Sequence, residues 1–134
     1  MPPKEPGPSK PIERIVEEVG LYPVEAYQFV SDGLRHTVHR LKGHVKDPQA
    51  SRHVSGRELS EGLRDYALSQ WGLLARTVLE RWNVTTTEDF GRIVFALVES
   101  GWMTKTDEDT LADFKNVFDF RLTFEKGYRI ECKA

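Results

Sequence analysis

The chain of 134 residues contains a single cysteine, Cys132. One cysteine cannot form an internal disulfide bond or a thiolate zinc site, so neither can stabilise this fold. A reducing, cytoplasmic setting is the expectation, because disulfide-free proteins are typical there. No apolar run approaches the roughly 20 residues that a membrane-spanning helix needs, so we expect no membrane span.

The N-terminus also lacks the apolar stretch of a signal peptide. Residues 1–11 hold five prolines, which favour an extended chain that does not pack. We therefore predict a disordered tail over residues 1–10 and a single domain over residues 11–134.

Motifs for common enzyme chemistry are missing as well. The chain has no G-x-S-x-G turn, no Walker loop, no G-x-G-x-x-G fingerprint and no H-E-x-x-H pair. A calcium loop beginning at Asp107 fails, because Ala112 and Phe118 occupy its glycine and glutamate positions. His36 and His39 could share a helix face, but a metal site needs further ligands. We predict no metal, no cofactor and no catalytic residues; a small enzyme with a His/Arg site assembled in space is the alternative.

Charge is distributed unevenly along the chain. The formal net charge is −2, so the whole molecule has no general attraction to nucleic acid. Residues 35–53 nevertheless hold all four histidines and five basic side chains against one acidic side chain, Asp47. This segment therefore carries +4 and the remainder carries −6. The asymmetry favours a binding or adaptor protein whose partner is RNA, a ribonucleoprotein or an acidic protein surface.

The predicted binding surface combines the basic and imidazole residues of this segment with two arginines that follow it. They are Arg35, His36, His39, Arg40, Lys42, His44, Lys46, Arg52, His53, Arg57 and Arg64. The competing interpretation is that these charges only solvate a helix end and a loop. The acidic stretch 107–113 is a second candidate surface, or the intramolecular counterpart of the first.

Apolar residues recur at helical spacing in five segments. These are residues 11–20, 22–43, 56–82, 86–100 and 107–118. The segment 22–43 is apolar on two faces, so we expect it at the centre of the core. Residues 56–82 form either one kinked helix or two helices that meet near Gly72. Residues 43–53 lack periodicity and are expected to form an exposed loop.

Capping signals support these helices. Ser55 and Glu58 match the S-x-x-E capping box, which makes them a helix start rather than a nucleophile and its base. The other expected caps are Gly20, Thr86 with Asp89 or Thr85 with Glu88, Gly101 with Trp102 folded back onto Leu97, and Thr106.

The C-terminal residues change to an alternating pattern. Phe120, Leu122 and Phe124 alternate with polar residues, which predicts a β-hairpin over residues 120–132 with a turn at 125–127. Two helices followed by a hairpin match the end of a winged helix, with residues 107–118 as the recognition helix. That helix would begin with three acids, so we do not expect sequence-specific DNA binding.

Several segments together resemble a family of short, conserved hypothetical proteins from planctomycete and verrucomicrobial bacteria. They are IERIVEE, YPVEAYQFV, HVSGRELSEGLRDYALSQWG, TTEDFGRIVFALVESG and KTDEDTLADFK. The resemblance covers about residues 12–120 and implies a bacterial, cytoplasmic protein. The family has no assigned activity, so it implies no functional residues. The sequence as a whole predicts a compact, mainly α (α+β) domain of about five helices closed by a hairpin.

Overall fold

The computed structural model describes residues 10–42, 54–105 and 109–124. The predicted disordered tail, the predicted loop at 43–53 and the hairpin residues 125–132 lie outside the described residues, apart from Lys10. So do the predicted cap Thr106 and the acids Asp107 and Glu108.

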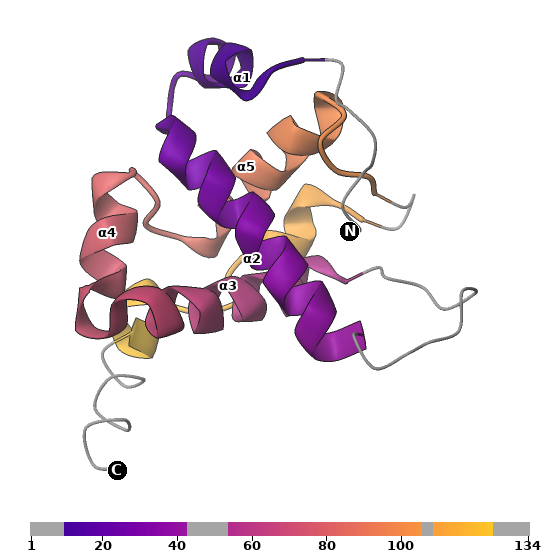
Figure 1. The fold of residues 1–134 in the computed structure, drawn as a ribbon. Helices are drawn as coiled ribbons and strands as arrows, with labels where there is room; N and C mark the ends of the chain where they lie inside the picture. Colours follow the sequence, from indigo (N-terminus) through magenta and orange to yellow (C-terminus); the bar gives the residue numbers. More distant parts are fainter. Residues whose placement is uncertain (1–9, 43–53, 106–108, 125–134) are drawn as a thin grey trace.

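The described chain is mainly helical, as predicted (Figure 1). Its five α-helices are α1 (Ile12–Val19), α2 (Val24–Lys42), α3 (Gly56–Trp71), α4 (Ala75–Arg81) and α5 (Thr87–Glu99). The 3₁₀ helix η1 (Gly72–Leu74) connects α3 to α4, and a second 3₁₀ helix, η2 (Leu111–Phe114), follows α5. Residues 120–124 form a further helical turn. The ranges that the structure describes contain no β-strand.

Helix α2 lies at the centre of the fold. It contacts α1, α3 and α5, and Figure 1 shows it running diagonally across the latter two. Tyr27, Val30 and Leu34 are fully buried, as the two apolar faces of the segment predict. Leu41, an apolar residue of the same segment, is 39% exposed and lies in the last turn of the helix.

Two glycines allow α2 and α3 to approach closely. A Cβ atom on Gly33 of α2 would lie 2.3 Å from Leu63 Cδ2 of α3. A Cβ atom on Gly62 of α3 would lie 2.0 Å from Thr37 Oγ1 of α2. The crossing is therefore reciprocal, since each helix supplies a glycine that accommodates a side chain of the other.

Gly72 separates α3 from α4, which settles the choice left open for residues 56–82. Its φ of 50° and ψ of −121° lie in a region that favours glycine, and the chain then passes through η1 before α4 begins.

The predicted capping box at the start of α3 is present, since Ser55 Oγ accepts from Glu58 N–H and Glu58 Oε1 accepts from Ser55 N–H, both at 3.0 Å.

Both predicted ends of α5 are confirmed. Thr86 is the N-cap and forms a capping box with Asp89. At the other end Gly101 has a φ of 86°, and Trp102 N–H donates to Leu97 O at 2.8 Å. Together with the bond from Gly101 N–H to Val98 O, this is a Schellman motif.

The predicted helix over residues 107–118 is wrong. Within the described residues 109–118 only η2 is helical, Thr110 is extended, and Asn116 has a φ of 50°. The tertiary contacts of Phe114 explain the difference. Its fully buried ring packs so close to Gly91 of α5 that a Cβ there would lie 2.9 Å from it. Tertiary packing thus overrides the local helical pattern.

The predicted hairpin and the winged-helix-like C-terminal half are not supported either, because residues 120–124 are helical. Asp119 begins this turn, and its carboxylate accepts from Leu122 N–H at 3.0 Å. Phe120 and Phe124 share a face in a strand, where the period is two, and also in a helix, where they are four apart. Leu122 decides between the two, since it is 56% exposed whereas a hairpin would have buried it beside both phenylalanines.

Candidate binding surface

The described part of the predicted surface lies on the C-terminal half of α2. Arg35, His36, His39 and Arg40 are all exposed on two consecutive turns of the helix. We call these four residues the basic face. Lys42 ends the helix, and its side chain lies outside the described residues together with His44, Lys46, Arg52 and His53.

Asp65 of α3 holds Arg40 of the basic face together with its own neighbour Arg64. Arg40 Nη1 lies 2.8 Å from Asp65 Oδ2, and Arg64 Nε lies 2.9 Å from Asp65 Oδ1. Burial alone would raise the pKa of Asp65, but the hydrogen bonds from Arg64 and Arg40 outweigh it and hold the pKa below its usual value. Asp65 therefore stays ionised and keeps both guanidinium groups in place.

The imidazole of His36 packs on an aromatic ring of α3. The ring centroids of His36 and Tyr66 lie 5.2 Å apart. Arg64 in turn lies with its guanidinium carbon 5.9 Å from the centre of the Phe118 ring, within the range of a cation–π contact. Asp65 thus connects the predicted residues Arg40 and Arg64, and Tyr66 packs against the predicted residue His36.

The remaining predicted residues are less closely associated. Arg35 pairs with Asp32 of its own helix at 3.5 Å, with both side chains more than half exposed, so the pair is weak. Arg57 is exposed in the first turn of α3, and among the described residues no ion pair joins it to the basic face. Asp32 and Asp65 place negative charge beside these arginines. Both residues lie outside 35–53, so the charge of +4 counted for that segment did not include them.

A buried polar network lies at the start of α5. Asp89 accepts from Tyr22 O–H at 2.6 Å, from Arg92 Nη1 at 2.7 Å and from Thr85 and Thr86 N–H at 2.9 and 3.1 Å. Burial raises the pKa of Asp89, but these hydrogen bonds, led by that of Tyr22, bring it below its usual value. The donors saturate the carboxylate, so the network fixes the start of α5 rather than offering a reactive group.

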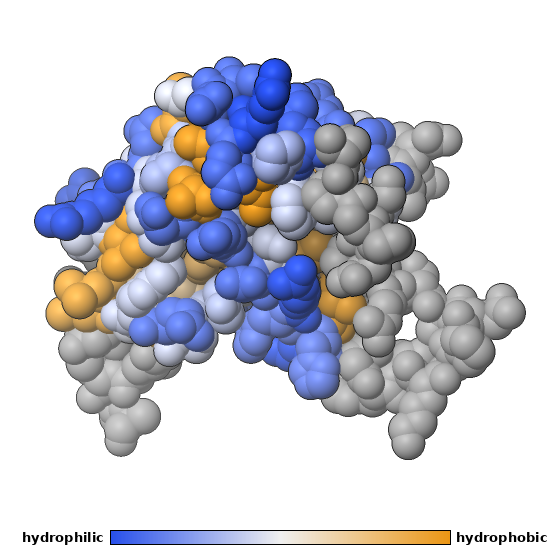
Figure 2. Space-filling model, turned by 45° about the horizontal axis from the view of Figure 1, so that its top comes forward, coloured by the Kyte–Doolittle hydropathy of each residue, from blue (hydrophilic) through white to orange (hydrophobic). Residues whose placement is uncertain are grey.

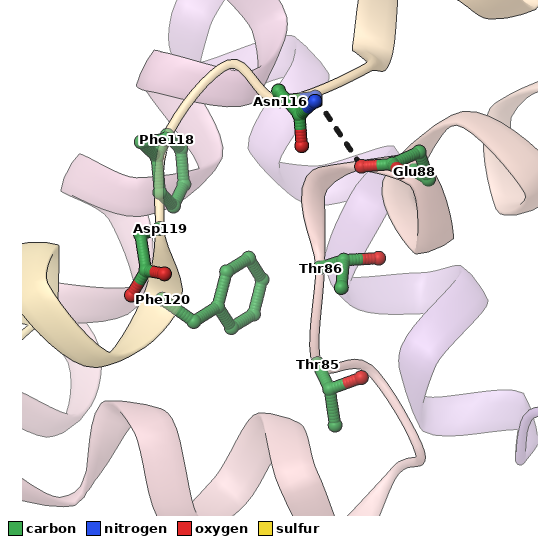
Figure 3. A pocket seen from close by; sticks show the side chains of 7 residues that line it. All are labelled: Thr85, Thr86, Glu88, Asn116, Phe118, Asp119 and Phe120. Atoms are coloured by element: carbon green, nitrogen blue, oxygen red, sulfur yellow. Dashed lines mark hydrogen bonds between the residues drawn. The ribbon is translucent and has the colours of Figure 1, made fainter.

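A groove of about 280 Å³ adjoins this network (Figure 3). Its walls are the segment before α5 and the segment between η2 and the last helical turn, and its lining is Thr85, Thr86, Glu88, Asn116, Phe118, Asp119 and Phe120. Figure 3 shows Glu88 accepting from Asn116, and the two threonine hydroxyls turned away from Phe120; both hydroxyls contact Asp89. The two threonine hydroxyls and Glu88 are therefore engaged by contacts within the fold itself.

A second groove, of about 220 Å³, opens between α2, α3 and α4. Sequence reasoning missed it, because helical spacing of apolar residues over 56–82 does not distinguish a ring in the core from one that lines a groove. The rings of Tyr66 and Trp71 line the groove and are only partly buried. A usable signal was the position of Trp71 directly before the helix-breaking Gly72, where a large ring cannot be covered by the following turn.

Among the described residues, no group of three or more His, Cys, Asp or Glu side chains is arranged to hold a metal ion. In the same ranges, no helix combines the length and the apolar character needed to cross a membrane. No protein-family model, curated protein or solved structure matches the chain. The resemblance noted from the sequence therefore stays a prediction.

Proposed function

We propose that this protein is a non-enzymatic binding module that contacts an acidic protein surface with the basic face of α2. The observation that carries the proposal is the exposure of Arg35, His36, His39 and Arg40 on adjoining turns of one helix. Asp65 and Tyr66 of α3 restrain Arg40 and His36, so less side-chain entropy is lost when a partner binds.

An acidic protein fits this face better than RNA does. Asp32 and Asp65 lie among the arginines, and their charges would repel a phosphate backbone. A protein partner can instead place a few carboxylates where the arginines reach them, and such contacts favour specificity and association rate. Exposed histidines also suit a contact surface, whereas histidine catalysis needs a concave site. A cytoplasmic, bacterial setting, as the sequence suggests, completes the proposal.

The test compares two double variants with equal changes in net charge. Arg35→Glu with Arg40→Glu reverses the basic face, and Arg81→Glu with Arg121→Glu reverses two exposed arginines elsewhere. Tagged wild-type and variant proteins are used for affinity capture from the native cytoplasm, with bound protein and RNA both identified. We expect an acidic protein that is captured by the wild type and the control but reduced at least tenfold by the first variant.

Two results would contradict the proposal. Equal capture by all three proteins would remove the basic face from the interaction. Capture of RNA, with affinity that falls steeply and log-linearly with salt, would replace the acidic protein by a nucleic acid.

A further inference from the structure

The groove between α2, α3 and α4 is built from aromatic rings. Phe29 lies at its base, with its ring centroid 5.5 Å from Tyr66, 5.4 Å from Trp71 and 5.9 Å from Trp82. Phe29 is 5% exposed, whereas the other three rings are only partly buried. Three different helices or their ends thus contribute ring surface to one opening.

The rim of the groove is acidic. Glu25 and Asp32 of α2 line it, together with two glutamine side chains, Gln28 and Gln70. Glu25 is exposed and has no ion-pair partner among the described residues, and Asp32 has only its weak pair with Arg35. Aromatic faces attract a cation through their quadrupole, and a nearby carboxylate adds a direct charge contact.

Exposed apolar side chains also follow the groove residue Trp71 in the sequence. Leu73 and Leu74 of η1 come after Trp71 and Gly72 and are 64% and 59% exposed. Figure 2 shows apolar side chains gathered at the left edge of the molecule, the side on which Figure 1 places the turn from α3 to α4. A polypeptide ligand could therefore bury apolar side chains here while a charged side chain enters the groove.

We propose that this groove binds an arginine side chain of a partner polypeptide. A guanidinium group is planar, stacks on aromatic faces and pairs with carboxylates in a fork, so Tyr66, Trp71 and Trp82 supply its stacking surface and Glu25 its charge. The groove is open rather than closed around its centre, which suits a flat group better than a spherical quaternary ammonium. This groove is proposed to bind a cation, whereas the neighbouring basic face is proposed to bind an acidic surface. The inference therefore does not depend on the proposed function.

The test titrates the ¹⁵N-labelled full chain with a short peptide, acetyl-Gly-Gly-Arg-Gly-Gly-amide, and follows the indole N–H signals by NMR. The signals of Trp71 and Trp82 should move, whereas that of Trp102, whose indole donates to Lys10 O at 2.8 Å, should not. Parallel titrations use the same peptide with citrulline, which is uncharged and nearly isosteric, and with trimethyl-lysine.

Two variants complete the design. Glu25→Gln removes the rim charge without touching the rings and should weaken binding of the arginine peptide roughly two- to fivefold. Glu99→Gln removes an exposed charge at the far end of α5 and should leave the binding unchanged.

Equal affinity for the citrulline peptide would overturn the proposal, because the groove would then recognise shape and not charge. Tighter binding of trimethyl-lysine would overturn the assignment of arginine. The absence of any shift at Trp71 and Trp82 up to about 10 mM peptide would remove the site.

Discussion

Asp89 is the residue with the densest set of polar contacts in the described chain. Its carboxylate joins Tyr22 of the segment before α2 to the start of α5, through a hydrogen bond between residues 67 positions apart. Burial, together with this bond to Asp89, raises the pKa of the Tyr22 hydroxyl well above its ordinary value. A single side chain therefore caps α5 and attaches it to the N-terminal half of the chain.

Stability should depend on the ionisation of Asp89. Its pKa is lower in the folded state than in the unfolded state, so its stabilising contribution is complete above pH ~4 and fades as the pH falls toward the lower folded value. Asp89→Asn should lower the free energy of unfolding by about 1–3 kcal/mol at pH 7, because hydrogen bonds to a charged group are lost. Urea unfolding from pH 7 to pH 3 measures this effect.

The difference in free energy of unfolding between wild type and Asp89→Asn should become smaller below pH ~4. Tyr22→Phe, which keeps the carboxylate and removes one donor, should show an intermediate loss. A difference that stays constant down to pH 3 would mean that Asp89 contributes through packing alone.

Single residues also show where sequence reasoning reached its limit. Ser55, Thr86 and Gly101 were predictable because a cap depends on residues within one or two turns. Tyr22 and Asp89 were each visible, but their contact was not, since nothing local couples positions so far apart.

The helices, like the caps, were predictable where they depend on local sequence alone. The pattern of apolar residues gave α1 to α5, yet Phe114 and Phe120 were misassigned because their partners lie elsewhere in the fold. The Phe120 ring lies 5.5 Å from that of Phe90 in α5, and this contact is satisfied by a helical turn as well as by a strand. The crossing of α2 and α3 was missed for the same reason, since Gly33 and Gly62 look like weak points when each helix is considered alone.

The crossing should be sensitive to one added methyl group. Gly62→Ala would normally stabilise a helix by about 1 kcal/mol. Here the new Cβ meets Thr37, whose hydroxyl is held by a 2.7 Å bond to Gly33 O and cannot turn aside freely. We expect a net loss of about 1–3 kcal/mol in thermal or urea unfolding.

Gly62→Ala combined with Thr37→Ala should recover part of this loss, because two of the three clashing atoms are removed. Additive effects of the two substitutions would contradict the contact.

The described helices differ in how much of their surface packs against the rest of the fold. Helix α2 packs against three other helices, whereas α1 has eight residues and buries only Ile15. The predicted binding site shows the same limit of sequence reasoning at this scale. The basic face was found from composition, but Asp65 and Tyr66 come from a different helix and entered only with the fold.

Amide hydrogen exchange should reflect this arrangement. Amides in the middle of α2 should exchange only on global unfolding, whereas those of α1 should exchange through local opening at lower free energy. Exchange measured by mass spectrometry or NMR at several denaturant concentrations separates the two. Equal protection of α1 and α2 would indicate that the described helices unfold as a single unit.

The groove of aromatic rings gives the molecule an optical property of its own. The indoles of Trp71 and Trp82 lie 5.4 Å apart with their planes at 81°, and they come from the end of α3 and the end of α4. Chromophores so close and so oriented couple their electronic transitions, and the coupling depends on the turn at Gly72 that brings them together. The chain thus carries a chiral pair of chromophores whose signal reports directly on the geometry between α3 and α4.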